Sequence, residues 1–173
     1  MSNRQIVRLG NRSSLGKRLI LLSQMLVLSF SLFLISSCDG IDCTVNNVVA
    51  LRMGFYLSDG TEQSFGDTLT ITAAGTDSVL LNRAVRVKQL ALPMSYSAKA
   101  DTLSMFFGKQ VVTLCVKKTN KAHFESPDCP VVVFHELEGL EFDDPAGLFD
   151  SIVIVRKSVN YEPFENIRFY IAD

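Results

Sequence analysis

The sequence has no tryptophan and only two histidines among its 173 residues. Proteins that bind sugars on a β-sheet usually present exposed flat aromatic rings. Here the four tyrosines are scattered, and most of the 12 phenylalanines fall in apolar stretches typical of a core. A glycine-rich phosphate-binding loop is also missing. These absences give no support for a carbohydrate-binding face or a phosphate site, and we expect no cofactor.

The two histidines limit any hydrolytic site. A serine hydrolase triad would need His123 or His135, and the nearby partners are Ser126 and Asp128. The chain has no Gly-x-Ser-x-Gly motif, and serine and aspartate beside a proline are typical of turns. We therefore expect no catalytic residue.

A zinc site finds little support either. His123, Cys129 and His135 recur at intervals of six, whereas zinc sites usually take two ligands close together in sequence. The segment "HELEG" lacks the second histidine of a zinc-protease motif. In a strand, His135 and Glu136 would also point to opposite faces. We expect no zinc at these residues.

Acidic residues are concentrated between residues 136 and 150. Ca²⁺ takes six to eight oxygen ligands, and Asp143 and Asp144 in "EFDDPAG" are the weak calcium candidates of the chain. Because the spaced Asp-x-Asp-x-Asp-Gly pattern is missing, a solvated acidic loop is the expected outcome. The alternative to a non-enzymatic protein is an envelope hydrolase or metal-dependent enzyme that uses His123, His135 and this segment.

No acidic residue occurs in the first 37 residues, which contain five basic ones, and residues 19–35 carry no charge. A basic flank followed by an apolar stretch is the layout of a secretory signal. The stretch is also long enough to cross a bilayer, but "ISSC" at residues 35–38 resembles the lipobox of bacterial lipoprotein precursors. That resemblance implies lipid transfer to the sulfur of Cys38, cleavage before it, and a chain anchored by two or three acyl groups.

Removal of residues 1–37 changes the charge balance. The whole chain has 17 Lys and Arg against 18 Asp and Glu, and without the five basic residues of the leader 12 remain, a net charge of −6. Such a surface repels a phosphate backbone, so we expect no nucleic-acid partner. The mature chain shows no linker or repeat. We predict a signal peptide over residues 1–37, a lipidated tether over 38–44 and one domain over 45–173.

Short stretches of period-two alternation run through the mature chain. In "TLTITA" the residues Leu69, Ile71 and Ala73 share one face and threonines the other. Pro93 ends the run "VLLNRAVRVKQLAL", and separators rich in Gly, Pro, Asn and Asp divide the later runs. About nine to ten short strands predict an all-β fold, an antiparallel β-sandwich of immunoglobulin-like or related type. The uncharged runs "PVVVF" and "SIVIV" are predicted to be central strands.

Three thiols remain once Cys38 is lipidated, and an oxidising compartment favours a disulfide between two of them. We interpret "QVVTLCVKKTNKAHFES" as a hairpin that turns at residues 119–120, which sets Cys115 opposite Phe124 and Cys129 opposite Gln110. Cys115 and Cys129 would then lie about 17 Å apart along the strand, too far for a bond. We predict a Cys43–Cys129 disulfide that pins the tether to the fold, and an inert, packed Cys115.

Two segments of the chain, "HFESPDC" and "DSIVIVRKSVNYEPFENIRFYI", together with a cysteine shortly after the lipobox, resemble small lipoproteins of Bacteroidota of unknown function. The resemblance implies an outer-membrane lipoprotein, facing the periplasm or the cell surface. Asp39 and Asp42 loosely resemble the acidic surface-export signal of that group. We expect a membrane-anchored, non-enzymatic binding or structural accessory protein, held by its N-terminal lipid, with an envelope protein as a possible partner.

Overall fold

The computed structural model describes residues 23–25, 43 and 48–172. The chain divides into two units, Met1–Ile41 and Asp42–Asp173. In the first unit residues 23–25 are helical, and the rest of the predicted signal peptide and Cys38 lie outside the described residues. Among the described residues, no helix has the length and apolar character needed to cross a membrane.

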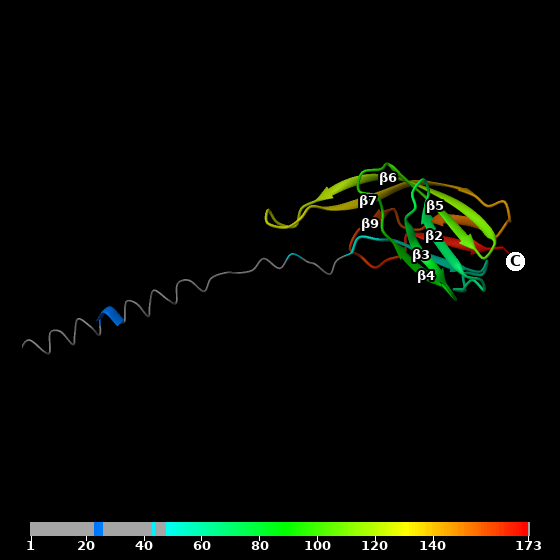
Figure 1. Cartoon of the computed structure of the whole chain (residues 1–173), viewed down its shortest axis with the longest axis horizontal. Helices are drawn as coiled ribbons and strands as arrows, with labels where there is room; N and C mark the ends of the chain where they lie inside the picture. The colour runs from blue at the N-terminus through cyan, green and yellow to red at the C-terminus, as the bar shows by residue number, and fades with distance from the viewer. Residues whose placement is uncertain (1–22, 26–42, 44–47, 173) are drawn as a thin grey trace, which may run out of the picture. The chain divides into compact units, whose positions relative to one another are not determined.

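The second unit is built from ten strands in two sheets (Figure 1). The four-stranded sheet has the order β4-β1-β10-β8, and the six-stranded sheet has the order β3-β2-β5-β6-β7-β9. The bounds are β1 Leu51–Tyr56, β2 Leu69–Ala73, β3 Val79–Ala84, β4 Gln89–Leu92, β5 Ala100–Phe107, β6 Gln110–His123, β7 Val132–Asp143, β8 Phe149–Ile154, β9 Ser158–Val159 and β10 Ile167–Ile171. The predicted all-β sandwich is confirmed.

Period-two alternation places one face of each principal strand in the core. In β1, Leu51, Met53 and Phe55 are buried, and in β2 Leu69 and Ile71 are buried, as "TLTITA" predicts. Five phenylalanine rings from both sheets and a loop meet at one end of the sandwich; they are Phe55, Phe65, Phe107, Phe149 and Phe169. Their ring centroids lie 4.4–6.1 Å apart in the contacting pairs, a range that favours aromatic packing. This cluster joins the two sheets into one core.

One strand pair departs from the antiparallel expectation, because β1 and β10 run parallel. The side chain of buried Asn166, just before β10, fixes this arrangement. Its Oδ1 accepts the N–H of Arg52 at 3.1 Å, and its Nδ2 donates to the carbonyls of Arg156 and Ser158 at 3.2 and 2.9 Å. Since these bonds satisfy a buried amide, Asn166 holds the chain that enters β10 beside β1.

The predicted central strands are wrong in position. "SIVIV" falls largely in β8, which lies at the edge of the four-stranded sheet. "PVVVF" leads into β7, which pairs with β6 along its length but with its other neighbour, β9, only at His135 and Glu136. Val131 is therefore 51% exposed. An uncharged run of valines here marks an exposed apolar segment and not a strand shielded on both sides.

The run "VLLNRAVRVKQLAL" forms two strands, β3 and β4, which belong to different sheets. The backbone at Arg83 and Arg86 is left-handed, with φ of 47° and 53°. L-residues adopt this conformation rarely and in isolation. At Arg83 it lies in the irregular last part of β3, and at Arg86 it interrupts the extended chain between β3 and β4. Pro93 ends the run after Leu92, as predicted.

The predicted turn at residues 119–120 is also wrong. β6 continues without a turn from Gln110 to His123, and Thr119 and Asn120 pair with Glu136 and His135 of β7. Cys115 consequently lies opposite Thr102 and Glu141. The connection between β6 and β7, residues 124–131, carries Cys129 at the tip of a long hairpin that projects beyond the other strands (Figure 1). We call this end of the sandwich the hairpin end.

Candidate functional site

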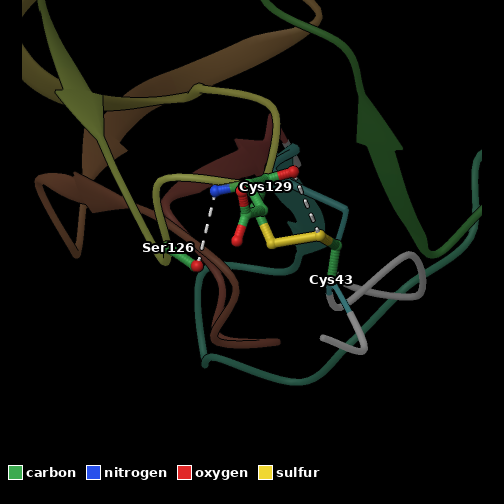
Figure 2. The surroundings of a disulfide bond; sticks show 4 residues. Cys43, Ser126 and Cys129 are labelled. Carbon is green, nitrogen blue, oxygen red and sulfur yellow. Dashed lines mark hydrogen bonds between the residues drawn. A yellow bond between two sulfur atoms is a disulfide. The ribbon is translucent and has the colours of Figure 1, made fainter. Parts of the chain in front are cut away.

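A disulfide joins Cys43 to Cys129 at the hairpin end, as the sequence predicts, with the two Cα atoms 5.5 Å apart (Figure 2). Cys129 closes a turn that starts at Ser126, whose carbonyl accepts the N–H of Cys129 at 3.1 Å. The Ser126 hydroxyl accepts the N–H of Asp128. Ser126 and Asp128 thus serve as turn residues, and the turn presents the thiol to the chain that leads into β1.

Cys115 is a free cysteine on the outer face of β6, and it is half-buried. Its neighbours Leu114 and Val116 point into the core, as expected from alternation. The position is compatible with the packed thiol that the sequence predicts.

The two histidines lie on opposite faces of the hairpin. His135 points inward, is 2% exposed, and its Nδ1 lies 2.8 Å from Oδ1 of Asn120. His123 points outward and stacks on Phe134 at 4.2 Å between ring centroids, with Tyr161 against Phe134 at 5.0 Å. A joint catalytic or metal role for the histidines has no geometric basis in this arrangement.

The acidic segment 136–150 spreads along β7 and the loop that follows it. Asp143 is exposed at the end of β7. Oδ2 of Asp144 accepts the N–H of Phe149 at 2.8 Å, and Gly147, with φ of 63°, turns the chain between them. Within the described residues, no group of three His, Cys, Asp or Glu side chains is placed to hold a metal ion. Asp144 is a loop residue that directs Phe149 into the core.

The inward face of β6 changes character as the strand leaves the sandwich. Val112, Leu114 and Val116 are fully buried in the core, and the next inward residue, Lys118, is 1% exposed. Its Nζ donates to the carbonyls of Ser95 and Ala98 and to Oδ1 of Asn120, and it lies 3.3 Å from Oδ2 of Asp101. A buried ammonium requires such partners. Here the loop between β4 and β5 supplies the two carbonyls, β5 supplies Asp101 and β6 itself supplies Asn120.

Asn120 completes what we call the Lys118 network, formed by Asp101, Lys118, Asn120 and His135. Its Nδ2 donates to the carbonyls of Tyr96 and Ala98 at 2.9 and 3.0 Å, which leaves Oδ1 to accept from Lys118 and from Nδ1–H of His135. Burial and the charge of Lys118 lower the pKa of His135, against an opposing effect of Asp101. The network therefore contains a neutral histidine and a loop clamped to β6.

An apolar groove lies beside the clamped loop at the hairpin end. It has a volume of about 610 Å³ and draws on three separate segments: the chain before β1, the β4–β5 loop and the start of β7. Its lining residues, here called the valine groove, are Val48, Val49, Pro93, Tyr96 and Val131–Val133. Val48 and Tyr96 are 65% and 72% exposed. An open apolar groove with one phenolic rim residue is suited to bind apolar groups and offers no chemistry for catalysis.

Residues 68–171 match the family model described as a family of unknown function, DUF6452, and this match covers more than half of the chain. The chain belongs to DUF6452. Comparisons with curated proteins and with solved structures gave no match. The DUF6452 match includes the hairpin with Cys129, the Lys118 network and two of the three walls of the valine groove. Cys43, Val48 and Val49 precede it.

Sequence reasoning missed both the Lys118 network and the valine groove of this DUF6452 chain. Lys118 carries a usable signal, because it continues the alternation of Val112, Leu114 and Val116 and so falls on the apolar face of a strand. The groove carries none, since its walls come from segments more than 30 residues apart in sequence. Tyr96 was noted only as one of four scattered tyrosines.

Proposed function

We propose that this protein is a lipoprotein of the bacterial cell envelope, tethered by an acylated Cys38, and that its β-sandwich acts as a non-enzymatic binding or structural accessory domain. The observation that supports this most directly is the Cys43–Cys129 disulfide. Disulfides persist in exported proteins, and this one lies five residues after the lipobox cysteine. An exported, lipid-anchored chain thus explains both cysteines, because Cys38 takes the lipid and Cys43 forms the disulfide.

The geometry favours binding over catalysis. Among the described residues, no hydrogen bond connects Ser126 to a histidine or to another general base. The ammonium of Lys118 is already bonded to its own partners. The valine groove, in contrast, is open to a ligand. Apolar contact with a membrane or an envelope protein is the role that this surface supports, and the outer membrane is the compartment that the resemblance to Bacteroidota lipoproteins favours.

The tether is tested by mass spectrometry of the chain purified from membranes of a bacterial host that processes lipoproteins. We expect an N-terminal Cys38 that carries diacylglycerol and an additional acyl chain. A Cys38→Ser variant should lose the lipid, whereas Cys43→Ser should keep its lipid and lose only the disulfide. An unmodified Cys38, or residues before Ser37 still attached, would contradict the proposal.

The non-enzymatic role is tested separately. The purified protein is assayed against generic esterase, glycosidase and peptidase substrates, with and without a chelator. We expect no turnover above that of a heat-denatured control. Activity that disappears in a His123→Ala or His135→Gln variant with unchanged folding would replace this proposal with an envelope enzyme.

A further inference from the structure

We propose that the hairpin end of the domain rests on the surface of the lipid bilayer, with the valine groove and the residues around it seated at the boundary between headgroups and acyl chains. This inference builds on the proposed lipid tether and specifies how the tethered domain is oriented. It assigns the valine groove a role as a membrane contact, in which the bilayer itself covers the apolar side chains.

The covalent path of the chain brings this end to the membrane. Cys43 lies five residues after Cys38, so a fully extended connection measures at most about 17 Å. Cys43 is bonded to Cys129 at the hairpin tip, and the chain resumes at Val48 on the wall of the groove. An acylated Cys38 therefore holds the hairpin end, and not the opposite end, within a short distance of the bilayer.

Exposed apolar side chains are concentrated at the same end. Among the described residues of the second unit, the large hydrophobic residues that are more than half exposed are Val48, Val79, Val85, Tyr96, Phe124 and Val131. Three of the six line the valine groove. Phe124, 68% exposed, directly follows His123 at the end of β6, opposite the start of β7. Contiguous apolar surface of this kind marks an interaction site.

The Lys118 network keeps the groove open. Lys118 and Asn120 bind the carbonyls of Ser95, Tyr96 and Ala98, so the loop backbone is fixed while the Tyr96 ring projects into solvent. A rigid backbone with an exposed tyrosine needs little ordering when it binds. Tyrosine is enriched where proteins meet the membrane interface, because its ring is apolar and its hydroxyl is polar.

Charge at the hairpin end also suits a neutral lipid surface. Lys99 and Lys121 are matched there by Glu125 and Asp128, and Lys121 is itself paired with Glu136 at 3.4 Å. The net charge of −6 for the mature chain opposes attraction to anionic headgroups. We expect apolar contact with zwitterionic lipid, with little dependence on salt.

The absence of native tryptophan allows a direct test with single-tryptophan reporters. The lipidated full chain carrying Tyr96→Trp or Phe124→Trp is reconstituted into phosphatidylcholine vesicles that contain lipids brominated near the headgroup. Phe106→Trp serves as the control, because Phe106 pairs with Val111 beside the β5–β6 turn at the opposite end of β6. We expect emission of the two hairpin-end reporters to fall about twofold relative to the control.

A second pair of variants connects quenching to the groove. The double variant Val48→Ser, Val131→Ser should abolish quenching of the Phe124→Trp reporter by the brominated lipids. Val79→Ser with Val85→Ser alters two valines of similar exposure near β3 and should leave it unchanged. Each variant is first checked for its disulfide and its melting temperature, so that loss of quenching is not mistaken for loss of fold.

The outcomes separate the two proposals. A lipidated chain whose reporters all remain as unquenched as the control overturns bilayer seating and leaves the tether intact. Reporters that become protected only when envelope proteins are added overturn it in favour of a protein partner. A chain that carries no lipid on Cys38 and does not bind the vesicles overturns both the tether and the seating.

Discussion

At the residue scale, Lys117 and Lys118 are adjacent in sequence and opposite in role. Lys117 points to solvent and pairs with Glu141, whereas the side chain of Lys118 is fully buried against Asp101. We predict that Lys118→Met lowers the free energy of unfolding by about 3 kcal/mol, because it leaves the carboxylate of Asp101 without its buried partner. Lys117→Met should leave it nearly unchanged, because the ion pair of Lys117 with Glu141 is exposed to solvent. Urea denaturation of both variants checks this, and equal effects would contradict a buried role for Lys118.

His135 makes the free energy of unfolding depend on pH. Its pKa is lowered by burial and by Lys118, so the folded domain keeps it neutral where the unfolded chain, with a pKa of about 6.5, binds a proton. Since the unfolded state binds more protons, the free energy of unfolding falls as the pH drops below about 6.5. We predict that His135→Gln loses less stability than the wild type between about pH 7.5 and pH 5.5. Thermal melts of both proteins at the two pH values check it, and equal losses of stability would contradict it.

At the element scale, the disulfide ties the chain before β1 to the tip of the β6–β7 hairpin. The bonded cysteines are 86 residues apart, for which the chain-entropy model gives about 4.5 kcal/mol. We predict that the double variant Cys43→Ser, Cys129→Ser loses several kcal/mol of unfolding free energy, and that hydrogen exchange increases most at residues 124–131. Cys115→Ser is the matched control and should have little effect. Uniform exchange across all strands would indicate instead that the bond supports the whole sandwich.

The strands show how far sequence patterns extend at this scale. In β2, alternation predicts buried Leu69 and Ile71 correctly, because the strand lies between β3 and β5 and turns one face to the core. The turn predicted at Thr119 and Asn120 failed, since eleven residue pairs with β7 keep β6 extended through residues that favour turns locally. The Cys43–Cys129 pairing was right although the register used to derive it was wrong. The longer hairpin separates Cys115 from Cys129 even further.

The candidate functional site was harder to predict from the sequence than the strands were, for a physical reason. His123, His135, Asp143 and Asp144 attract attention because their side chains can do chemistry, yet alternation and loop geometry keep them apart. The valine groove forms only when three distant segments meet, and no local pattern encodes that meeting. Its residues are ordinary apolar ones, and what distinguishes them is exposure, a property of the folded chain.

At the scale of the whole molecule, the sandwich has two unlike ends. Five packed phenylalanines fill one end, and the buried Lys118 network and the exposed valine groove occupy the other. Apolar burial stabilises the first end directly, whereas at the second end polar contacts hold the β4–β5 loop in place. Such a division is reasonable if the hairpin end contacts a partner or a membrane while the aromatic end maintains the fold.

This division leads to a prediction about cooperativity. Phe55 of β1 contacts rings from both sheets, with centroids 6.0 Å from Phe107 of β5 and 5.2 Å from Phe169 of β10. We predict that Phe55→Leu lowers the free energy of opening equally for amides of β5 and β10, because neither sheet can retain its buried face without the other. The expected loss is about 1–2 kcal/mol. Phe106→Leu, on the outer face of β5, should change both by less than about 0.5 kcal/mol. Native-state hydrogen exchange resolves the two strands, and a loss confined to β10 would mean that the sheets unfold independently.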